Sequence, residues 1–548
     1  MRQIDLVKHY AQKRCLVVDD MPDVRVALTN MLRVFGVLEI DIVANGEQAM
    51  EICRSNHFDM VLCDYNLGQG MDGQQVLEEL RFRNQLNNTS IFVMVTAESS
   101  REMVLGALEY RPDDYITKPI TTALLRTRLD RVVLRHQELI KIKQAMDEKD
   151  YEKAMVRGDE RLDNNTSYRS NCLQIKAEMS LRLLNFKQAE DIYRNELKEH
   201  PVIWAKLGLG KTLVAKKEYE DAQKHLQEVV ASDRRYVEAH DLLADAYLGL
   251  GDQVKAQESM QEAAAISPKS VMRQRRLANL AKLNDDTEAV LNASRQALRV
   301  AKNSCYESEE DYFNLARELT DLSAEGASDA SDHYIKESFE VLGRLQKKPY
   351  FDASADAQSN ALKSRAMINQ RKVVEAEKYL IKALQIVNNA QDSIRPEASL
   401  DLVKTLLKSG NKDKANELLQ NLADKHSDNP SILQKVDAMS DNPRSQEGRS
   451  RAAHMTKNGI GFYEQKKYRD AIKVFRNAVG VFPGHLGLNL NLIQAAVAEI
   501  KEGGDKKGLE SVCRKALHRV SGIDKQDSQY ARYDYLRKQI DEIFPQSR

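Results

Sequence analysis

Glycine and proline are scarce in this chain of 548 residues, which has 24 glycines and 11 prolines. Their combined share is about half of the usual value, and this scarcity disfavours a turn-rich β fold. Charged residues make up 30% of the chain, as expected of long solvated helices. The length exceeds that of one compact core, because roughly 150 residues per domain gives three or four units, or one domain followed by a repeat array.

Long apolar runs are also missing. No stretch approaches the roughly 18 apolar residues that a membrane span needs, and the first residues of the chain lack the apolar segment of a signal peptide. Hydrophobic residues nevertheless make up 42% of the chain, which is enough to exclude wholesale disorder. We therefore expect a folded, soluble protein of the cytoplasm that has no contact with a membrane.

Cysteine and histidine show no metal-binding pattern. The six cysteines lie ten or more residues apart, so we expect free thiols and neither a disulfide framework nor a cysteine-based zinc site. The eleven histidines form no HExxH motif and no close pairs. This spacing disfavours a zinc enzyme.

An excess of one charge is absent as well, since 82 basic residues balance 82 acidic ones. Residues 1–120 contain 12 basic and 18 acidic side chains, whereas residues 121–143 contain six basic and two acidic ones. A nucleic-acid binder normally has a larger basic excess, because its affinity comes from neutralised phosphates. The balance of charge therefore disfavours a regulator that binds RNA or DNA.

Residues 14–120 alternate short apolar runs with helical patterns. The runs cover 15–18, 39–44, 60–63, 91–95 and 115–117, and the helical pattern after the fourth run covers 100–110. Five such pairs are typical of a parallel sheet that is covered by helices on both faces. We predict a doubly wound, flavodoxin-like α/β domain, in which ligands bind at the carboxyl ends of the strands.

Three carboxylates follow two of these strands at their carboxyl ends. Asp19 and Asp20 follow the first apolar run, and Asp64 follows the third. The predicted topology places the first and third strands side by side, so these acids should converge on one pocket. Carboxylates that share one pocket raise one another's pKa unless a cation lies among them. Mg²⁺ suits this pocket, because it prefers carboxylate and carbonyl oxygens, water and phosphate.

Two further polar side chains end the fourth and fifth strands at the same edge. Thr96 brings a hydroxyl group, and Lys118 brings an ammonium group. Phosphoryl transfer needs mainly positioning and neutralisation of the phosphoryl oxygens. Acids, a hydroxyl and a cation around one metal are therefore suited to moving a phosphoryl group onto a carboxylate.

These residues carry a resemblance to a known family. The segments VVDD, VLCDYN, VTAE and DDYITKP are similar to the motifs of response regulator receiver domains, in the same order. The resemblance implies that Asp64 is the phosphoacceptor and that Asp19 and Asp20 bind Mg²⁺ together with Asp64 and the backbone carbonyl of Asn66. It also implies that Thr96 and Lys118 hold the phosphoryl oxygens and that Tyr115 moves inward when Thr96 does.

The segment after Asp64 departs from the common receiver pattern. It has the sequence YNLGQGMDG, which lacks the proline that many receivers carry there and is one residue longer.

The fifth strand and the helix after it are similar to those of receivers that form dimers. In those receivers an acid at the position of Asp114 pairs with an arginine of the partner at the position of Arg128, although Leu124 stands where they commonly have an acid. The resemblance implies a homodimer that forms on phosphorylation.

A helical repeat replaces the strand pattern after about residue 140. Its anchor positions are Ala154, Ala189, Ala222, Ala256 and Val290, which are 35, 33, 34 and 34 residues apart. This period is similar to that of tetratricopeptide (TPR) repeats, which are pairs of antiparallel helices about 34 residues long. Gly459, Phe462, Ala471, Phe475, Ala478 and Pro483 form a further copy, and Ala376 and Ala415 mark degenerate ones. We expect about seven or eight repeats in a TPR solenoid.

The predicted organisation has seven parts. They are an N-terminal extension (1–12), a receiver domain (13–135), a long basic helix that couples it to the repeats (121–147), TPR repeats (140–302), degenerate repeats (303–439), a linker (440–450) and C-terminal TPR and capping helices (451–548). The polar segments 303–309, 323–332 and 440–450 are rich in turn formers, so we expect loops there. GLGKT at 208–212 falls inside a repeat helix and lacks the first glycine of a phosphate-binding loop.

The interpretation of the whole chain is a bacterial response regulator of a two-component phosphorelay that is not an enzyme in its own right. A histidine kinase would donate the phosphoryl group to Asp64, and the TPR region would bind protein partners. Two alternatives remain open. One is a constitutive TPR adaptor whose receiver serves only as a docking module or as a sink for phosphoryl groups. The other is a regulator that binds nucleic acid.

Overall fold

The computed structural model describes residues 5–97, 110–164, 168–324, 328–390 and 393–545. The chain divides into two compact units, Met1–Asp311 and Tyr312–Arg548. Among the helices of the described residues, none combines the length and the apolarity that a membrane crossing requires.

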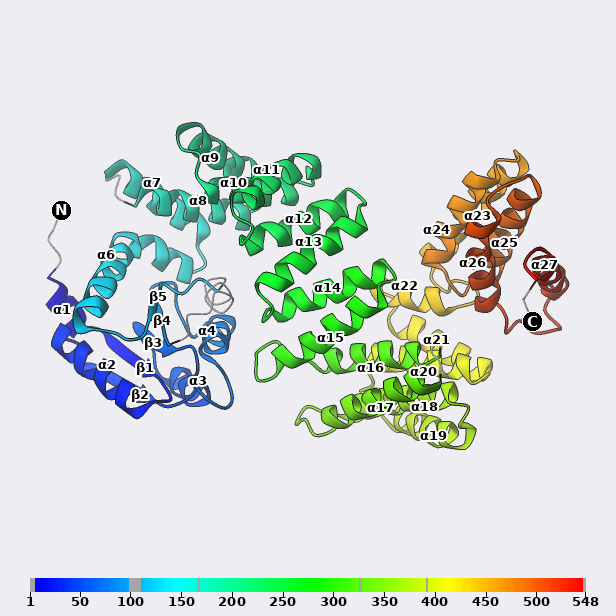
Figure 1. The fold of residues 1–548 in the computed structure, drawn as a ribbon, viewed down its shortest axis with the longest axis horizontal. Helices are drawn as coiled ribbons and strands as arrows, with labels where there is room; N and C mark the ends of the chain where they lie inside the picture. The colour runs from blue at the N-terminus through cyan, green and yellow to red at the C-terminus, as the bar shows by residue number, and fades with distance from the viewer. Residues whose placement is uncertain (1–4, 98–109, 165–167, 325–327, 391–392, 546–548) are drawn as a thin grey trace. The chain divides into compact units, whose positions relative to one another are not determined.

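The first unit contains a five-stranded sheet near its N-terminus (Figure 1). Its strands are β1 (Arg14–Val18), β2 (Glu39–Val43), β3 (Met60–Asp64), β4 (Ile91–Thr96) and β5 (Asp114–Thr117). They lie in the order β2-β1-β3-β4-β5, and every neighbouring pair is parallel. The predicted α/β fold and the pairing of the first and third strands are therefore confirmed.

Helices cover both faces of this sheet. They are α1 (Leu6–Ala11), α2 (Pro22–Phe35), α3 (Gly46–Ser55), α4 (Gly73–Phe82) and α6 (Thr122–Asp147). Alternate residues of the strands point to opposite faces, so Val17 packs with α2 and α6, whereas Leu16 packs with α3 and α4. The three inner strands are apolar almost throughout because both of their faces are buried. The helix expected at 100–110 lies outside the described residues except for Tyr110.

The predicted coupling helix α6 lies against the sheet domain along most of its length. The hydroxyl of Tyr10 donates to Asp130 at 2.8 Å, and His136 Nε2 lies 2.6 Å from Asp113 Oδ1. Near the end of the helix, Asp147 accepts hydrogen bonds from the backbone and side chains of Asn88 and Thr89. The helix is thus anchored to the sheet domain up to its last turn.

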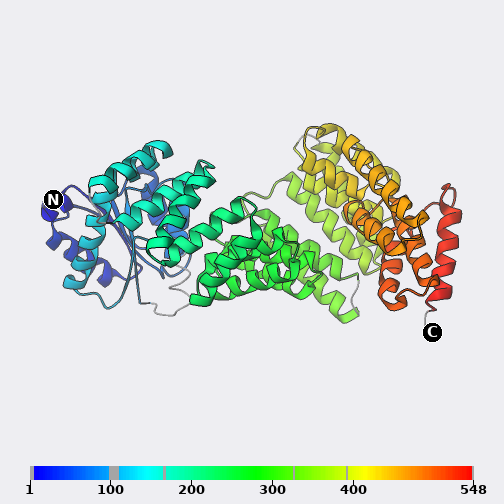
Figure 2. The ribbon, with the colours of Figure 1, turned by 90° about the horizontal axis from the view of Figure 1, so that it is seen from above.

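Pairs of antiparallel helices make up the rest of the first unit (Figure 2). They are α7 (Tyr151–Asn164), α8 (Arg169–Arg182), α9 (Phe186–Glu199), α10 (Ile203–Ala215), α11 (Tyr219–Ser232), α12 (Val237–Gly249), α13 (Gln253–Ile266), α14 (Val271–Leu283) and α15 (Thr287–Ala301). All five predicted anchor positions are buried. Gly210 lets α10 and α11 approach closely, because a Cβ atom there would lie 2.6 Å from Leu226.

The second unit consists of helices joined by turns and short loops, with no strand among its described residues. Its helices are α16 (Glu309–Leu322), α17 (Ser328–Leu345), α18 (Ala353–Asn369), α19 (Val373–Asn389), α20 (Pro396–Lys408), α21 (Lys412–Lys425), α22 (Pro430–Met439), α23 (Gln446–Glu464), α24 (Tyr468–Val481), α25 (Leu486–Lys501), α26 (Lys506–Arg519) and α27 (Tyr530–Ile543). The first of them begins in the last residues of the first unit.

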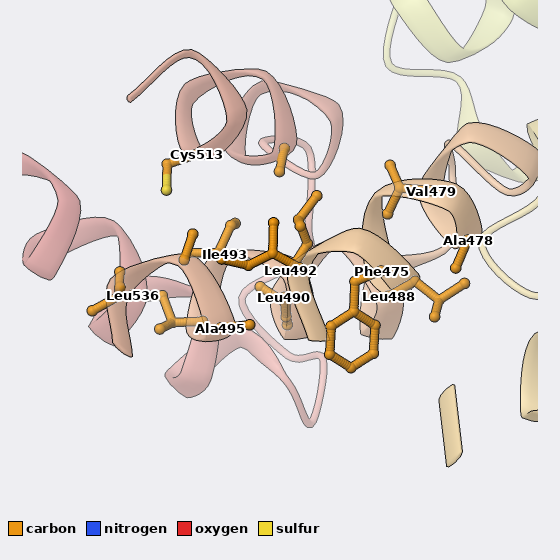
Figure 3. Close-up of a cluster of buried hydrophobic side chains, with 14 of the residues drawn as sticks. Phe475, Ala478, Val479, Leu488, Leu490, Leu492, Ile493, Ala495, Cys513 and Leu536 are labelled. Carbon is orange, nitrogen blue, oxygen red and sulfur yellow. The ribbon is translucent and has the colours of Figure 1, made fainter. Parts of the chain in front are cut away.

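The C-terminal repeat uses the same close approach as the first unit. A Cβ atom on Gly459 would lie 2.4 Å from the ring of Phe475. Phe475 belongs to a core that continues through Leu488 and Ile493 to Leu536 (Figure 3). The small residue of one helix and the large residue of the next therefore recur with the same spacing of 16 residues in both units.

Two of the three polar segments are less irregular than expected, whereas the expected loop at 303–309 is confirmed up to Ser308. Helix α16 begins at Glu309, α17 at Ser328 and α23 at Gln446, so the expected loops at 323–332 and 440–450 are helical in their second halves. Ser445 explains the last case, since its side chain accepts a hydrogen bond from the backbone N–H of Gly448. Serine is common in turns and also at the N-cap of a helix, so its presence alone does not separate the two.

Candidate functional site at the carboxyl edge of the sheet

The three carboxylates meet at the edge where the parallel strands end. Asp19 directly follows β1 and is fully buried, Asp64 ends β3 with 5% exposure, and Asp20 is exposed. Each offers an oxygen atom within 4.8 Å of the others. This proximity follows from the strand register, because Val18 of β1 pairs with Cys63 of β3, so the next residue of each strand reaches the same pocket.

Lys118 connects two of these acids. Its Nζ donates to Asp19 Oδ2 and to Asp64 Oδ2, both at 2.7 Å. The backbone N–H of Lys118 donates to the carbonyl of Thr96 at 2.7 Å. The end of β4 therefore holds the backbone of Lys118 in place. The ammonium group is the counter-charge that two buried carboxylates require.

The charges of the pocket shift one another's protonation. Burial raises the pKa of Asp64, and the neighbouring Asp19 raises it further, while the hydrogen bond from Lys118 only partly offsets this. Burial would lower the pKa of Lys118, but the two carboxylates outweigh it and raise that pKa. The pocket therefore holds more negative charge than its one lysine neutralises.

Thr96 and Tyr115 occupy neighbouring strands beside this pocket. Thr96 is the last residue of β4 and is buried, and it pairs with Thr117 of β5. Tyr115 lies half-buried in β5, where it packs against the apolar cluster beneath α3 and α4. The residues expected at the ends of four strands thus share one edge of the sheet.

The loop after Asp64 adopts conformations that its glycines permit. Gly68 and Gly70 have φ angles of 78° and 105°, a region that side chains with a Cβ atom rarely enter. Gly73 lies so close to the preceding strand that a Cβ atom would be 2.0 Å from the carbonyl oxygen of Asp64. The backbone N–H of Asn66 points back to Asp64 Oδ1 at 3.4 Å. Glycines therefore accommodate the longer loop.

Sequence reasoning missed some residues that hold the pocket. Arg25 of α2 donates to the carbonyl of Asp19 at 2.6 Å, and Glu47 of α3 accepts from the N–H of Met71 at 3.1 Å. Neither residue belongs to a short motif. The amphipathic pattern of each helix predicts which residues are buried, but it does not predict which polar side chain reaches the loop.

The donor atoms of this pocket fit a magnesium ion. Three carboxylates supply hard oxygen ligands within 4.8 Å of one another, and Mg²⁺ prefers such oxygens. The excess negative charge around Asp64 also favours a divalent cation. The residues that would hold it are Asp19, Asp20 and Asp64 through their side chains.

The two residues expected at a dimer interface pair within one chain. Arg128 donates to Asp114 at 2.5 Å and to the carbonyl of Tyr115 at 3.0 Å. Arg131 lies 3.5 Å from the same carboxylate. A bond from Asp114 to Arg128 of a second copy stays a prediction, and it would have to replace this internal pair.

The GLGKT segment has no features of a phosphate-binding loop. It lies inside helix α10, where Thr212 donates to the carbonyl of Gly208 and Lys211 pairs with Glu238 at 3.1 Å. The segment is therefore part of the packing of a repeat.

Comparisons with known proteins agree with both parts of the chain. Residues 15–130 match the response regulator receiver domain, and residues 207–271 match the tetratricopeptide repeat. Over 119 residues the chain is 32% identical to chemotaxis protein CheY-3 of Vibrio cholerae, which covers 22% of this chain and 90% of that protein. The chain belongs to the response regulator receiver family. Chemotaxis protein CheY of Pseudomonas aeruginosa is 29% identical, over 22% of this chain and 94% of its own length.

Solved structures match parts of the chain at low TM-scores. A CheY-like receiver domain protein from Methanospirillum hungatei is 25% identical over 23% of this chain and 97% of its own, with a TM-score of 0.21. MamA from Desulfovibrio magneticus is 20% identical over 30% of this chain and 93% of its own, with a TM-score of 0.27. The family matches alone show that in this response regulator the receiver domain at residues 15–130 is followed by tetratricopeptide repeats at residues 207–271.

Proposed function

We propose that this response regulator accepts a phosphoryl group on Asp64 from the phosphohistidine of a histidine kinase. The bridge that Lys118 forms between Asp19 and Asp64 at the carboxyl edge of the sheet carries the proposal. In this bridge the buried carboxylate of Asp64 lies beside a cation and a second acid, which supports a role as nucleophile. The kinase and the site roles are inferences from this arrangement and from membership of the receiver family.

The reaction would exchange one bond to phosphorus for another. An oxygen of Asp64 attacks the phosphorus atom, an acyl phosphate bond forms, and the bond between phosphorus and the imidazole nitrogen of the kinase breaks. Lys118 would leave Asp64 to pair with the phosphoryl oxygens, and the hydroxyl of Thr96 would donate to another of them. Bound Mg²⁺ would neutralise charge on the same oxygens.

The signal would leave through protein partners of the TPR region. Tyr115 lies in the strand that neighbours Thr96, so an inward movement of both would alter the surface around β5 and α6. That movement could favour homodimers or expose a partner site on the repeats. All six cysteines are free thiols, which suits a protein that works in the reducing cytoplasm.

Intact-mass measurement tests the acceptor. Purified full-length protein is incubated with Mg²⁺ and a small acyl phosphate, and we expect one labile phosphoryl group per chain. The variant Asp64→Asn should gain none. The control Asp41→Asn changes a carboxylate of β2 that pairs with Arg14, and it should be modified like the wild type. Equal modification of Asp64→Asn and wild type would refute the proposed acceptor.

The same samples separate a switch from a constitutive adaptor. Partners are captured from a bacterial lysate with the phosphorylated protein and with Asp64→Asn, and dimers are measured by gel filtration. A switch predicts a difference in bound partners or in dimers. If Asp64 is phosphorylated but the bound partners and the oligomeric state stay identical, the receiver serves only as a docking module or as a sink for phosphoryl groups.

A further inference from the structure

A lysine of the repeats binds both ends of the loop that follows the proposed phosphoacceptor. Lys269 lies in the turn between α13 and α14 of the first unit. Its Nζ donates to the hydroxyl of Tyr65 at 2.9 Å and to Asp72 Oδ2 at 3.0 Å. The same atom is 4.8 Å from the centre of the Tyr65 ring, a distance that gives a favourable cation–π contact.

The two residues that Lys269 holds are the two ends of one loop. Tyr65 directly follows Asp64, and it is buried in the cluster beneath α3 and α4. Asp72 is the N-cap of α4 and forms a capping box with Gln75. The backbone N–H of Gly73 donates to the carbonyl of Tyr65 at 2.8 Å. Lys269 therefore adds a bridge from outside the receiver at the base of the loop that carries Asn66.

Further contacts join α4 to the same part of the array. The side chain of Gln75 donates to the carbonyl of Lys302 at 3.1 Å. The rings of Phe82 and Tyr306 meet edge to face with their centroids 6.0 Å apart. These contacts extend from the start of α4 to its end, so the array touches the helix at several points as well as at Lys269.

We propose that Lys269 is a positioning residue for the acceptor loop and that docking of the repeats on α4 opposes phosphorylation of Asp64. The inference rests on the proposed function and adds the element that regulates it. In the unmodified chain the repeats hold Tyr65 and Asp72 in one arrangement. Contacts that form in the unmodified state stabilise that state relative to any state that must rearrange them.

Phosphorylation requires such a rearrangement near the bridge. It replaces the single carboxylate charge of the residue before Tyr65 with a phosphoryl group that carries up to two negative charges, and it withdraws Lys118 from Asp64. A loop held at both ends has fewer conformations with which to respond. The fraction of chains ready to react sets the observed rate, so removal of the bridge should raise the rate of phosphorylation and loosen α4 from the array.

The test compares four full-length proteins. They are the wild type, Lys269→Ala, Lys269→Arg and the matched control Lys255→Ala. Lys255 resembles Lys269 because it pairs with Asp252 at 2.8 Å and lies 5.7 Å from the ring centre of Tyr247, yet both of its partners belong to the repeats. Initial phosphorylation rates with Mg²⁺ and a small acyl phosphate are followed by intact mass. Hydrogen exchange of residues 65–82 and 266–306 reports docking, and thermal unfolding confirms that each variant is folded.

We expect Lys269→Ala to phosphorylate roughly two- to fivefold faster than wild type, the range for a half-exposed ion pair with a hydrogen bond. Its two segments should exchange faster before any phosphorylation. Lys269→Arg keeps the charge and the donors and should resemble the wild type, as should Lys255→Ala. Phosphorylated wild type should show the same faster exchange as unmodified Lys269→Ala.

Two other results have different meanings. An equal or lower rate in Lys269→Ala, with all four proteins phosphorylated, would overturn the role of Lys269 and leave Asp64 as the acceptor. If no protein gained a phosphoryl group, the proposed function would fail, and the coupling would fail with it.

Discussion

The receiver buries charged residues at its candidate site, whereas the repeats bury small apolar residues where their helices pack. At the edge of the sheet, Asp19, Asp64 and Lys118 place three charges in a buried pocket. In the repeats, the residues at the contacts between helices are small and apolar. Ala222 and Ala256 are examples, and they have no exposed surface. The first arrangement is costly for folding but can bind a metal and a phosphoryl group. The second brings helices together and has no reactive group.

Charge buried in the repeats is arranged differently from charge in the receiver pocket. Arg273 of α14 is almost fully buried, and its guanidinium group forms a bidentate pair with Asp241 at 2.8 and 3.0 Å. This pair has one cation for one anion. The receiver pocket has more acids than cations, which marks it as a site for a ligand.

The largest expected effect lies in the repeats. In Gly459→Ala the new methyl group would overlap the ring of Phe475, so we expect a loss of about 2 kcal/mol in the free energy of unfolding. Urea unfolding followed by circular dichroism, with hydrogen exchange of residues 446–545, measures it.

Gly461→Ala is the control for that substitution. Gly461 lies in the same helix with nothing within 4 Å of the position of a Cβ atom, so alanine should stabilise the helix by about 0.5 to 1 kcal/mol. Equal effects of the two substitutions would show that close approach of helices does not determine stability in the repeats.

A smaller effect of opposite sign is expected in the receiver pocket. Asp64→Asn removes one of the crowded acids, so without metal it should raise the free energy of unfolding by on the order of 1 kcal/mol at neutral pH. Mg²⁺ should stabilise the wild type by mass action and stabilise the variant much less. Thermal unfolding with and without Mg²⁺ measures both effects.

The pH dependence of this difference has a definite sign. The pKa of Asp64 is raised in the folded protein, so its contribution to stability is present below its ordinary pKa and is lost as the pH rises through the folded value. The advantage of Asp64→Asn should therefore shrink toward pH 4. An advantage that grew on acidification would contradict the assignment of Asp64 as the destabilised acid.

A third expected effect concerns the buried histidine of α6. Burial lowers the pKa of His136, although its hydrogen bond with Asp113 acts in the opposite direction. The stability that the neutral ring provides is present above its ordinary pKa and is lost as the pH falls through the lowered value.

His136→Gln should therefore flatten the decrease in the free energy of unfolding below pH 6.5, by a few tenths to about 1 kcal/mol. Chemical unfolding of the full-length protein at a series of pH values measures the slope. The exposed His454 lies in the repeats, and His454→Gln should leave this slope as it is in the wild type. An unchanged slope in His136→Gln would exclude this histidine as the acid-sensitive group.

The smallest effect is expected at the GLGKT segment. Lys211 is half-exposed and pairs with Glu238, so Lys211→Ala should change the free energy of unfolding by no more than about 0.5 kcal/mol. Calorimetric titration with ATP should detect no binding to either protein. ATP binding that Lys211→Ala abolished would place chemistry in the repeats and remove the contrast with the receiver.

Much of the receiver could be predicted because its signals are local. Apolar runs ended by Asp19, Asp64 and Thr96 indicate both the strands and the edge at which they end. The anchor residues of the repeats could be predicted for a similar reason, since a period near 34 residues is visible without any structure. The short helix α1 was not predicted, because six residues are too few to show a helical period.

The loops at 323–332 and 440–450 were predicted less well. Serine, aspartate and asparagine favour turns, yet they also begin helices, and local composition does not distinguish these uses. The anchoring of α6 could not be predicted either. Asp147 meets Asn88 across 59 residues of the chain, and no local pattern relates them.

The order of residues by itself determined the two kinds of architecture and the polar side chains at the ends of the strands, because hydrophobic periodicity and strand ends are local properties. Only the tertiary structure decided that Lys269 lies on Tyr65, which is 204 residues away, and that Arg128 pairs with Asp114 of its own chain. Such contacts depend on how helices and loops pack in three dimensions. The sequence around a lysine in a turn does not indicate which distant side chain it contacts.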